Sequence, residues 1–410
     1  MKPGRFIILV LDSFGIGAMD DVPLVRPQDK GANTFRSVLS AVPDMRFPNL
    51  GRLGLANAAG FEAGGLRFSS DAAYGRSDLM HFWCDSYWGH QELMGTRPRM
   101  PLEAPFSSMI DAVAHALRAA GHRVDYVGCP LKVLVVDNAM VIGDNIEADL
   151  GQNYNVTAAF DAVPFEKVKV VGRIVRNLTG VARVISFGSP GVSLQRILGA
   201  LETRNGTYVG INAPRSGVYR EGYLVAHMGF GVDAGEQLPR VLKDAGYRVV
   251  LIGKAADIID NPGGTSISAV DTETVMRTTV TEIADLDSGF VCSNVQETDL
   301  AGHRQDPFLY AEKLRIADSY IGDIIELLED TDILIVTADH GNDPLIGHPQ
   351  HTRERVPMLF HLRSRPAGLH DIGTRKTLAD MGATAAHYFS CGPLSFGESF
   401  LGMLPRGKTR

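Results

Sequence analysis

The sequence is poor in cysteine, and its four cysteines form no metal-binding pattern. They stand at Cys84, Cys129, Cys292 and Cys391, with no Cys-x-x-Cys pair among them. Disulfide frameworks and cysteine zinc sites both need paired or closely spaced cysteines. The scarcity argues against both kinds of site and fits a reducing compartment, so we expect a cytoplasmic protein.

Long apolar runs and positive net charge are absent as well. No run approaches the roughly 20 apolar residues that cross a bilayer, and the formal net charge is −7. A nucleic-acid-binding protein needs a basic face. We therefore expect neither a membrane nor a nucleic acid as partner. The apolar stretch 6–11 is followed at once by Asp12 and lacks a convincing cleavage site, which favours a buried first strand over a signal peptide.

What the chain does contain is a recurrent pattern of short aliphatic runs that end in polar residues or glycine. Such runs are typical of strands buried in a parallel sheet, whereas 307–328 and 377–389 have the apolar spacing of helices. Strand alternating with helix predicts an α/β fold with a doubly wound, mainly parallel sheet and functional loops at the carboxyl ends of its strands. The predicted strands are 6–11, 247–252, 289–294, 333–337 and 356–361.

The length of 410 residues predicts more than one ordinary domain. Residues 106–217 contain shorter predicted strands, and none of these ends in a cluster of acidic residues and histidines. We interpret 106–217 as an α+β cap domain inserted into a discontinuous core of 1–105 and 218–410.

Acidic residues and histidines gather just after three of the predicted core strands. Because the carboxyl ends of parallel strands meet at one edge of a sheet, we expect these side chains to converge. Taken singly, such an Asp is more often a helix cap, and such a His is more often solvated. Together, three carboxylates and three imidazoles suit two divalent ions of the manganese or zinc kind. The candidates are Asp12, Asp299, His303, Asp339, His340 and His351, with His348 as a rival for the role of His351.

Ser86 is the candidate nucleophile, in the segment 85–92. A serine hydroxyl needs a metal ion or a base to become reactive at neutral pH. Beside one of two metal ions, Ser86 would attack phosphorus and hold a phosphoryl group as an ester. The alternative is a polar loop with a serine in a turn. His90, close by, is assigned to a structural role.

Four segments, 12–17, 85–92, 338–344 and 351–357, resemble the signature segments of phosphopentomutases. These enzymes belong to the alkaline phosphatase superfamily, together with the cofactor-independent phosphoglycerate mutases. The resemblance runs from the first predicted strand to residues 397–400 and is weakest in the predicted insertion. The segment His-Thr-Arg-Glu-x-Val-Pro at 351–357 favours phosphopentomutase within the superfamily. An alkaline phosphatase-like core is therefore expected.

The resemblance also implies roles for individual residues. Ser86 stands where phosphopentomutases carry a phosphorylated threonine and phosphoglycerate mutases carry a serine. Two divalent ions, expected to be Mn²⁺, and a sugar bisphosphate as activator are implied. One ion would be held by Asp299, His303 and His351, and the other by Asp12, Asp339, His340 and the Ser86 hydroxyl. The implied substrate-binding residues are Asp149, Arg215 and Lys254.

Two departures from the family pattern concern the substrate. Phe187 stands where phosphopentomutases usually place an arginine that grips the substrate phosphate, and the spacing before His303 is closer to that of phosphoglycerate mutases. We therefore predict a mutase, acting through a phosphoserine, on a sugar monophosphate of the ribose 1-phosphate/5-phosphate type, with the identity of the sugar open. The alternatives are a metal-dependent phosphatase or phosphodiesterase that uses the same site, and a non-catalytic sugar-phosphate-binding relative.

Overall fold

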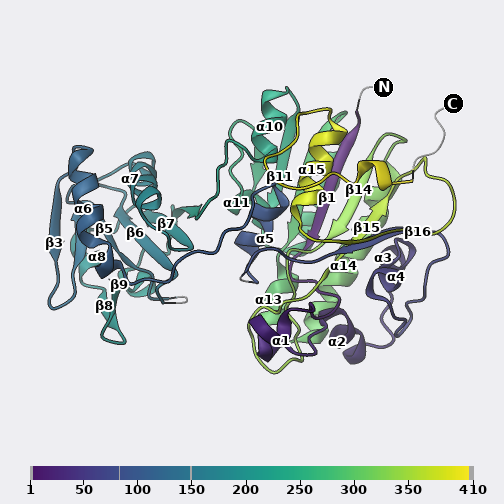
Figure 1. Ribbon diagram of the computed structural model, residues 1–410, viewed down its shortest axis with the longest axis horizontal. Helices are drawn as coiled ribbons and strands as arrows, with labels where there is room; N and C mark the ends of the chain where they lie inside the picture. The colour runs from purple at the N-terminus through teal and green to yellow at the C-terminus, as the bar shows by residue number, and fades with distance from the viewer. Residues whose placement is uncertain (1–2, 83, 148–149, 406–410) are drawn as a thin grey trace. The chain divides into compact units, whose positions relative to one another are not determined.

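The computed structural model describes residues 3–82, 84–147 and 150–405 (Figure 1). The chain divides into two compact units, which we call the core unit (Met1–Pro98 with Asp233–Arg410) and the insert (Arg99–Val232). The insert begins earlier and ends later than the predicted 106–217. It ends later because β10 (Leu224–Gly229) pairs with β7 (Arg183–Ser189) and so completes the sheet of the insert.

The core unit is built on an eight-stranded sheet in the order β12-β11-β13-β1-β14-β15-β2-β16. Its centre consists of four neighbouring parallel strands, which confirms the predicted mainly parallel α/β fold. All seven residues of β1 are buried, as expected of an apolar strand that is covered on both faces. The four strands are β11 (Arg248–Gly253), β13 (Gly289–Val295), β1 (Arg5–Leu11) and β14 (Ile333–Thr337).

For one predicted strand, the expected parallel direction is wrong. Residues 356–361 form β15 (Val356–His361), but β15 runs antiparallel both to β14 and to β2 (Ala73–Ser77). A buried apolar run looks the same in either direction, since the direction depends on the path of the chain between strands. Two short edge strands, β12 (Thr265–Ile267) and β16 (His370–Arg375), were not predicted.

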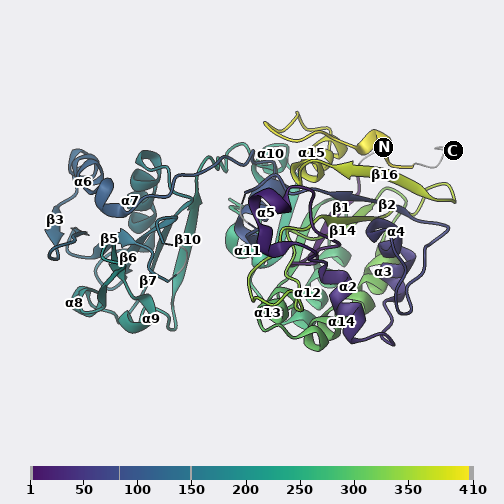
Figure 2. The ribbon, with the colours of Figure 1, turned by 60° about the horizontal axis from the view of Figure 1, so that its bottom comes forward.

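Helices cover both faces of the core sheet (Figure 2). The longest, α14 (Pro307–Leu327), begins where the Asp306 side chain accepts hydrogen bonds from two backbone N–H groups, and Pro307 occupies its first turn. Its buried residues recur every three to four positions, and each buried Leu or Ile contributes about 2 kcal/mol. The other core helices are α1 (Val22–Val25), α2 (Thr34–Ala41), α3 (Pro48–Arg52), α4 (Leu55–Ala59), α5 (Ser86–Leu93), α10 (Leu238–Asp244), α11 (Lys254–Ile258), α12 (Thr272–Ala284), α13 (Glu297–His303) and α15 (Ala379–Tyr388).

The insert is an α+β unit with its own six-stranded sheet, in the order β10-β7-β6-β5-β4-β3. Helices α6 (Ile110–Ala119) and α7 (Phe165–Leu178) share a hydrophobic core with residues of this sheet. A second hydrophobic cluster joins sheet residues to α8 (Leu194–Leu198) and to the hairpin of β8 (Leu201–Arg204) and β9 (Tyr208–Ile211). Its remaining elements are β3 (Val124–Val127), β4 (Val133–Val136), β5 (Met140–Asp144), β6 (Asn153–Ala159) and α9 (Ala213–Ser216).

In neither unit do the described residues include a helix that is long and apolar enough to cross a bilayer.

Candidate metal centre

Three carboxylates and one ammonium group lie at or just after the carboxyl ends of the four central parallel strands. Asp12 directly follows β1, and Asp339 comes two residues after β14. Asp299 lies in the first turn of α13, which follows β13. Lys254 is the first residue of α11, directly after β11. Because these strands are parallel neighbours, their ends bring the four residues to one edge of the sheet.

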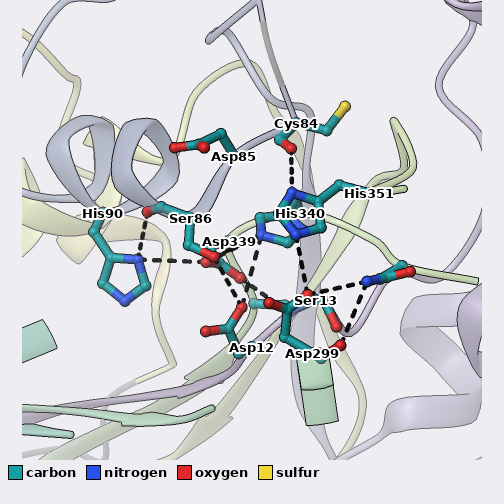
Figure 3. A network of polar contacts seen from close by, with 12 residues as sticks. Asp12, Ser13, Cys84, Asp85, Ser86, His90, Asp299, Asp339, His340 and His351 are labelled. Carbon is teal, nitrogen blue, oxygen red and sulfur yellow. Dashed lines mark hydrogen bonds and ion pairs between the residues drawn. The ribbon is translucent and has the colours of Figure 1, made fainter. Parts of the chain in front are cut away.

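Within the described residues, two groups of side chains place their ligand atoms within 4.8 Å of one another. One consists of Asp12, Asp339 and His340, and the other of Asp299, His340 and His351 (Figure 3). His340 therefore lies close to both groups, although the resemblance implies a role in only one. His303 adjoins the second group, with its Nε2 atom 2.9 Å from Nε2 of His351 and 3.4 Å from Oδ2 of Asp299.

The three histidines are held in one orientation by the backbone. The Nδ1 atom of each ring lies within hydrogen-bond distance of a carbonyl oxygen. A carbonyl only accepts, so Nδ1 carries a proton, and Nε2 is the ring nitrogen that faces the carboxylates. Metal-ligating histidines characteristically make this second hydrogen bond. The pairs are His303 with Pro349 (2.7 Å), His340 with Gly341 (3.0 Å) and His351 with Cys84 (2.6 Å).

Divalent ions fit this set of donors. The Oδ2 atoms of Asp12 and Asp339 are buried, and their partners among the described residues are ion-pair contacts. Such groups are costly unless cations compensate them. The Lys254 ammonium, 3.0 Å from Oδ2 of Asp12, supplies part of that charge. Mixed carboxylate and imidazole donors suit manganese or zinc.

The pKa values at the site follow from burial and charge. Burial, helped by the nearby Asp339 carboxylate, raises the pKa of Asp12 to about 7. Burial also lowers the pKa of His340 to about 4, which keeps this imidazole neutral, as a metal ligand must be. For Asp299, burial acts to raise the pKa, but His351 and other cationic neighbours outweigh it and hold the pKa well below its ordinary value.

Ser86 lies among these groups at the start of α5. The preceding Asp85 caps the helix by accepting hydrogen bonds from two backbone N–H groups. The Ser86 hydroxyl oxygen lies 2.6 Å from Nζ of Lys254, 2.9 Å from Nε2 of His340 and 3.1 Å from Oδ1 of Asp12. The hydroxyl is thus buried between a cation and two candidate metal ligands.

A glycine lets α5 approach the end of β14. A Cβ atom built on Gly89 would lie 2.7 Å from Cβ of Asp339 and 2.8 Å from its carbonyl oxygen. Heavy atoms do not approach that closely, so any larger residue at 89 would push the helix, and Ser86 with it, away from Asp339.

Several residues around the site were not predicted from the sequence to take part in it. His90, assigned there to a structural role, is buried, and its Nδ1 atom lies 2.8 Å from the Ser86 carbonyl oxygen and 3.4 Å from Oδ2 of Asp339. The signal was its position one helical turn after Ser86. Asn342 donates a hydrogen bond to Oδ1 of Asp299 at 3.1 Å, and its only sequence signal was its proximity to His340.

The rival ligand His348 has a different neighbour. Its Nε2 atom lies 3.3 Å from Oδ1 of Asp29. His351, not His348, joins the group that contains Asp299.

The predicted substrate-binding residues have different surroundings. Lys254 lies in the centre of the cluster, next to Ser86. Arg215 belongs to the insert, where its guanidinium donates a hydrogen bond to the Gly199 carbonyl and is more than half exposed. Asp149 lies outside the described residues.

Phe187, which replaces the arginine expected from the family pattern, is part of an aromatic cluster in the insert. The residue is buried, and its ring centre lies 6.3 Å from that of Tyr219 and 6.0 Å from that of Tyr223. The Tyr219 hydroxyl donates a hydrogen bond to Glu147 at 2.9 Å. A buried aromatic ring, packed against two tyrosines, thus stands where the family pattern predicted an arginine.

Comparison with known proteins gives consistent matches over nearly the whole chain. The family model described as the metalloenzyme superfamily matches residues 4–393. A phosphopentomutase of Symbiobacterium thermophilum is 31% identical, covering 97% of this chain and 97% of its own. A phosphopentomutase of Shewanella sediminis is also 31% identical, covering 97% and 99%. One of Caldanaerobacter subterraneus is 28% identical, covering 98% of each chain.

Proposed function

The chain belongs to the metalloenzyme superfamily and, within it, to the phosphopentomutase branch, and from this premise we propose that it is a phosphomutase acting on a sugar monophosphate. The observation that carries the proposal is the position of the Ser86 hydroxyl, buried between Lys254, His340 and Asp12. Ser86 would carry the phosphoryl group between turnovers.

We assign two divalent ions, proposed to be Mn²⁺, to the cluster. Asp12, Asp339 and His340 would hold one ion near the Ser86 hydroxyl, and the second would be held by Asp299, His303 and His351. When bound, such ions lower the pKa of a hydroxyl and stabilise the charge on phosphoryl oxygens. The buried Oδ2 atoms of Asp12 and Asp339 and the inward-facing Nε2 atoms support this assignment.

The residues of the chain itself orient and stabilise the phosphoryl group. The Lys254 ammonium, within 2.6 Å of the Ser86 hydroxyl oxygen, would neutralise a phosphoryl oxygen there. Ser86 is the first residue of α5, so the positive end of the helix dipole also faces a phosphate on it.

The proposed reaction exchanges phosphoryl groups without net hydrolysis. The bond between phosphorus and Ser86 Oγ breaks as a hydroxyl oxygen of the sugar monophosphate bonds to phosphorus, and the proton of that hydroxyl passes to the freed Ser86 oxygen. The resulting sugar bisphosphate then returns its other phosphoryl group to Ser86, and the departing sugar oxygen takes up a proton. Because the cycle starts from phosphorylated Ser86, a sugar bisphosphate is needed as activator.

The insert supplies the remaining part of the proposal. We assign it the role of a cap that excludes water, because a phosphoserine open to water would be hydrolysed. Asp149 and Arg215 are proposed to bind the substrate with Lys254. The substrate is proposed to be of the ribose 1-phosphate/5-phosphate type, and the aromatic packing of Phe187 leaves the identity of the sugar open. A small-molecule sugar phosphate as partner and a cytoplasmic location belong to the same proposal.

Intact mass spectrometry tests the role of Ser86. The protein is loaded with Mn²⁺ and incubated with ribose 1,5-bisphosphate or glucose 1,6-bisphosphate. We expect the mass of one phosphoryl group to be added to the wild type and to Ser86→Thr, but not to Ser86→Ala. Full activity of Ser86→Ala would show that another residue is the nucleophile.

The alternative activities use the same metal centre with water as acceptor. Phosphorus NMR of pentose and hexose monophosphates distinguishes migration of the phosphate from its release. Inorganic phosphate as the only product would replace the mutase with a phosphatase. The absence of any turnover, with sugar phosphate still bound, would indicate a non-catalytic relative.

A further inference from the structure

A chain of buried amide hydrogen bonds lies in the core unit, close in sequence to the two points where the chain leaves this unit and returns to it. It joins Thr96, Gln237, Gln91 and the carbonyl of Ile258. The three side chains are at most 6% exposed. Nothing in the proposed reaction uses them.

Gln91 links the two short helices that carry Ser86 and Lys254. It lies in the last turn of α5, and its Nε2 atom donates a 2.7 Å hydrogen bond to the carbonyl of Ile258, the last residue of α11. Ser86 and Lys254 are the first residues of the same two helices, and their side chains meet at 2.6 Å. The helices, which lie side by side in Figures 1 and 2, are thus joined at both ends.

The direction of the hydrogen bonds follows from the carbonyl. A carbonyl only accepts, so Gln91 must present its Nε2 atom to Ile258 and its Oε1 atom to Gln237. Gln237 in turn donates from Nε2 to Oε1 of Gln91 at 2.7 Å and to the hydroxyl of Thr96 at 2.8 Å. Both donors of the Gln237 amide are therefore used.

Gln237 also ties together the two points where the chain leaves and re-enters the core unit. The chain leaves after Pro98 and returns at Asp233. Thr96 lies just before the first crossing, and the backbone N–H of Thr96 donates to the carbonyl of Gln91 at 3.0 Å. Gln237 lies just after the second crossing. Both crossings are therefore fastened to α5 close to Gln91.

The Gln237 side chain is costly for the fold. Its Oε1 atom is buried and accepts no hydrogen bond from the described residues. Leaving a buried acceptor unpaired costs about 1–3 kcal/mol. A leucine at 237 would remove this acceptor but would leave Oε1 of Gln91 without its donor, so the Gln237 side chain serves the hydrogen-bond chain and not packing alone.

We propose that Gln237 and Gln91 are positioning residues. Their hydrogen bonds clamp α5 to α11 and to both crossings, and so keep the Ser86 hydroxyl next to the Lys254 ammonium. The clamp deepens the proposed function, since it rests on Ser86 as the phosphoryl carrier. Because both crossings are hydrogen-bonded to α5, a movement of the chain at either crossing would displace α5 and with it Ser86. Without the clamp, the two helices would move independently, and the 2.6 Å approach of the ammonium to the hydroxyl would be lost for part of the time.

Hydrogen exchange tests the clamp without any substrate. In the metal-loaded Gln237→Leu protein, we expect backbone amides of both α5 and α11 to exchange about tenfold faster than in the wild type. Gln237→Glu, which keeps the shape but loses both donors, should behave in the same way. The matched control is Asn57→Leu, which removes a buried amide from α4 and should change exchange only around α4. Unchanged exchange in α11 of Gln237→Leu would overturn the proposal.

Kinetics then show whether the clamp acts on the nucleophile. The rate of phosphoryl uptake from the bisphosphate should fall about tenfold in Gln237→Leu and in Gln91→Leu, with KM little changed. The double variant should be no slower than the slower single variant, because both remove one unit. Additive losses would contradict a shared clamp. A wild type that takes up no phosphoryl group refutes the proposed function, whereas the exchange result still decides whether the clamp exists.

Discussion

The Nε2 atoms of His303 and His351 face each other at 2.9 Å, and each ring is fixed from behind by a backbone carbonyl at its Nδ1 atom. Two neutral imidazoles cannot approach in this way, because both Nε2 atoms would present lone pairs. A proton on one Nε2 atom or a cation against both resolves this, and the carboxylate of Asp299 adjoins both. This relationship makes metal content the first property to measure.

Elemental analysis of the purified protein should find close to two divalent ions per chain. Asp339→Asn should lose at least one ion, because it neutralises a buried carboxylate that has an oxygen free to coordinate. Prolonged chelation should lower the melting temperature of the wild type, since a bound ion stabilises only the folded state. Asp244→Asn changes an exposed aspartate paired with Arg240 and serves as control. Full metal content in Asp339→Asn would contradict the assignment.

Lys254→Met should slow phosphoryl uptake by Ser86 about a hundredfold, because the only ammonium next to the hydroxyl among the described residues is removed. Rapid mixing with a sugar bisphosphate, followed by intact mass analysis, measures this rate. Lys376→Met is the matched control, since Lys376 is exposed and pairs with Asp78. Equal rates in the wild type and in Lys254→Met would exclude a direct role for the ammonium.

Glu92→Gln should destabilise the core unit by about 3 kcal/mol at pH 7, because the buried carboxylate accepts hydrogen bonds from Met80, His81, Thr377 and Leu378. Burial alone would raise the pKa of Glu92, but the hydrogen bond and charge of His81 outweigh it and lower the pKa below its ordinary 4.5. The stabilisation is therefore complete above about pH 4.5 and is lost as the pH falls through the folded-state pKa. Urea unfolding at pH 7, 5 and 4 should show the wild type and the variant converging towards acid. A constant difference at all three pH values would contradict this.

Phe187→Ala should destabilise the insert by about 3–5 kcal/mol, because it removes a buried ring from an aromatic cluster. Calorimetry and limited proteolysis should show earlier unfolding of the insert, with the metal content unchanged. Tyr219→Phe removes only the hydrogen bond to Glu147 and should cost about 1 kcal/mol. A stable Phe187→Ala protein would show that this ring does not hold the insert together.

The sequence by itself determined much of this protein. Its apolar runs predicted the bounds of β14 and β15 as the structure has them, and those of α14 to within one residue. Four short segments predicted the phosphopentomutase-like branch of the superfamily, which the comparisons confirm. These features are local. The pattern of apolar residues along a short segment indicates whether it forms a buried strand or a helix, and ligands that directly follow strands form recognisable sequence motifs.

Only the tertiary structure decided how distant segments meet. It set the antiparallel direction of β15, gave β10 to the insert, placed His340 close to both groups of ligands and brought His90 against Asp339. Gln237 and Gln91 are 146 positions apart, and a hydrogen bond between them leaves no periodic mark in the sequence. Ser86 was predicted from its motif, whereas its contact with Lys254 depends on two helices that pack together from distant parts of the chain.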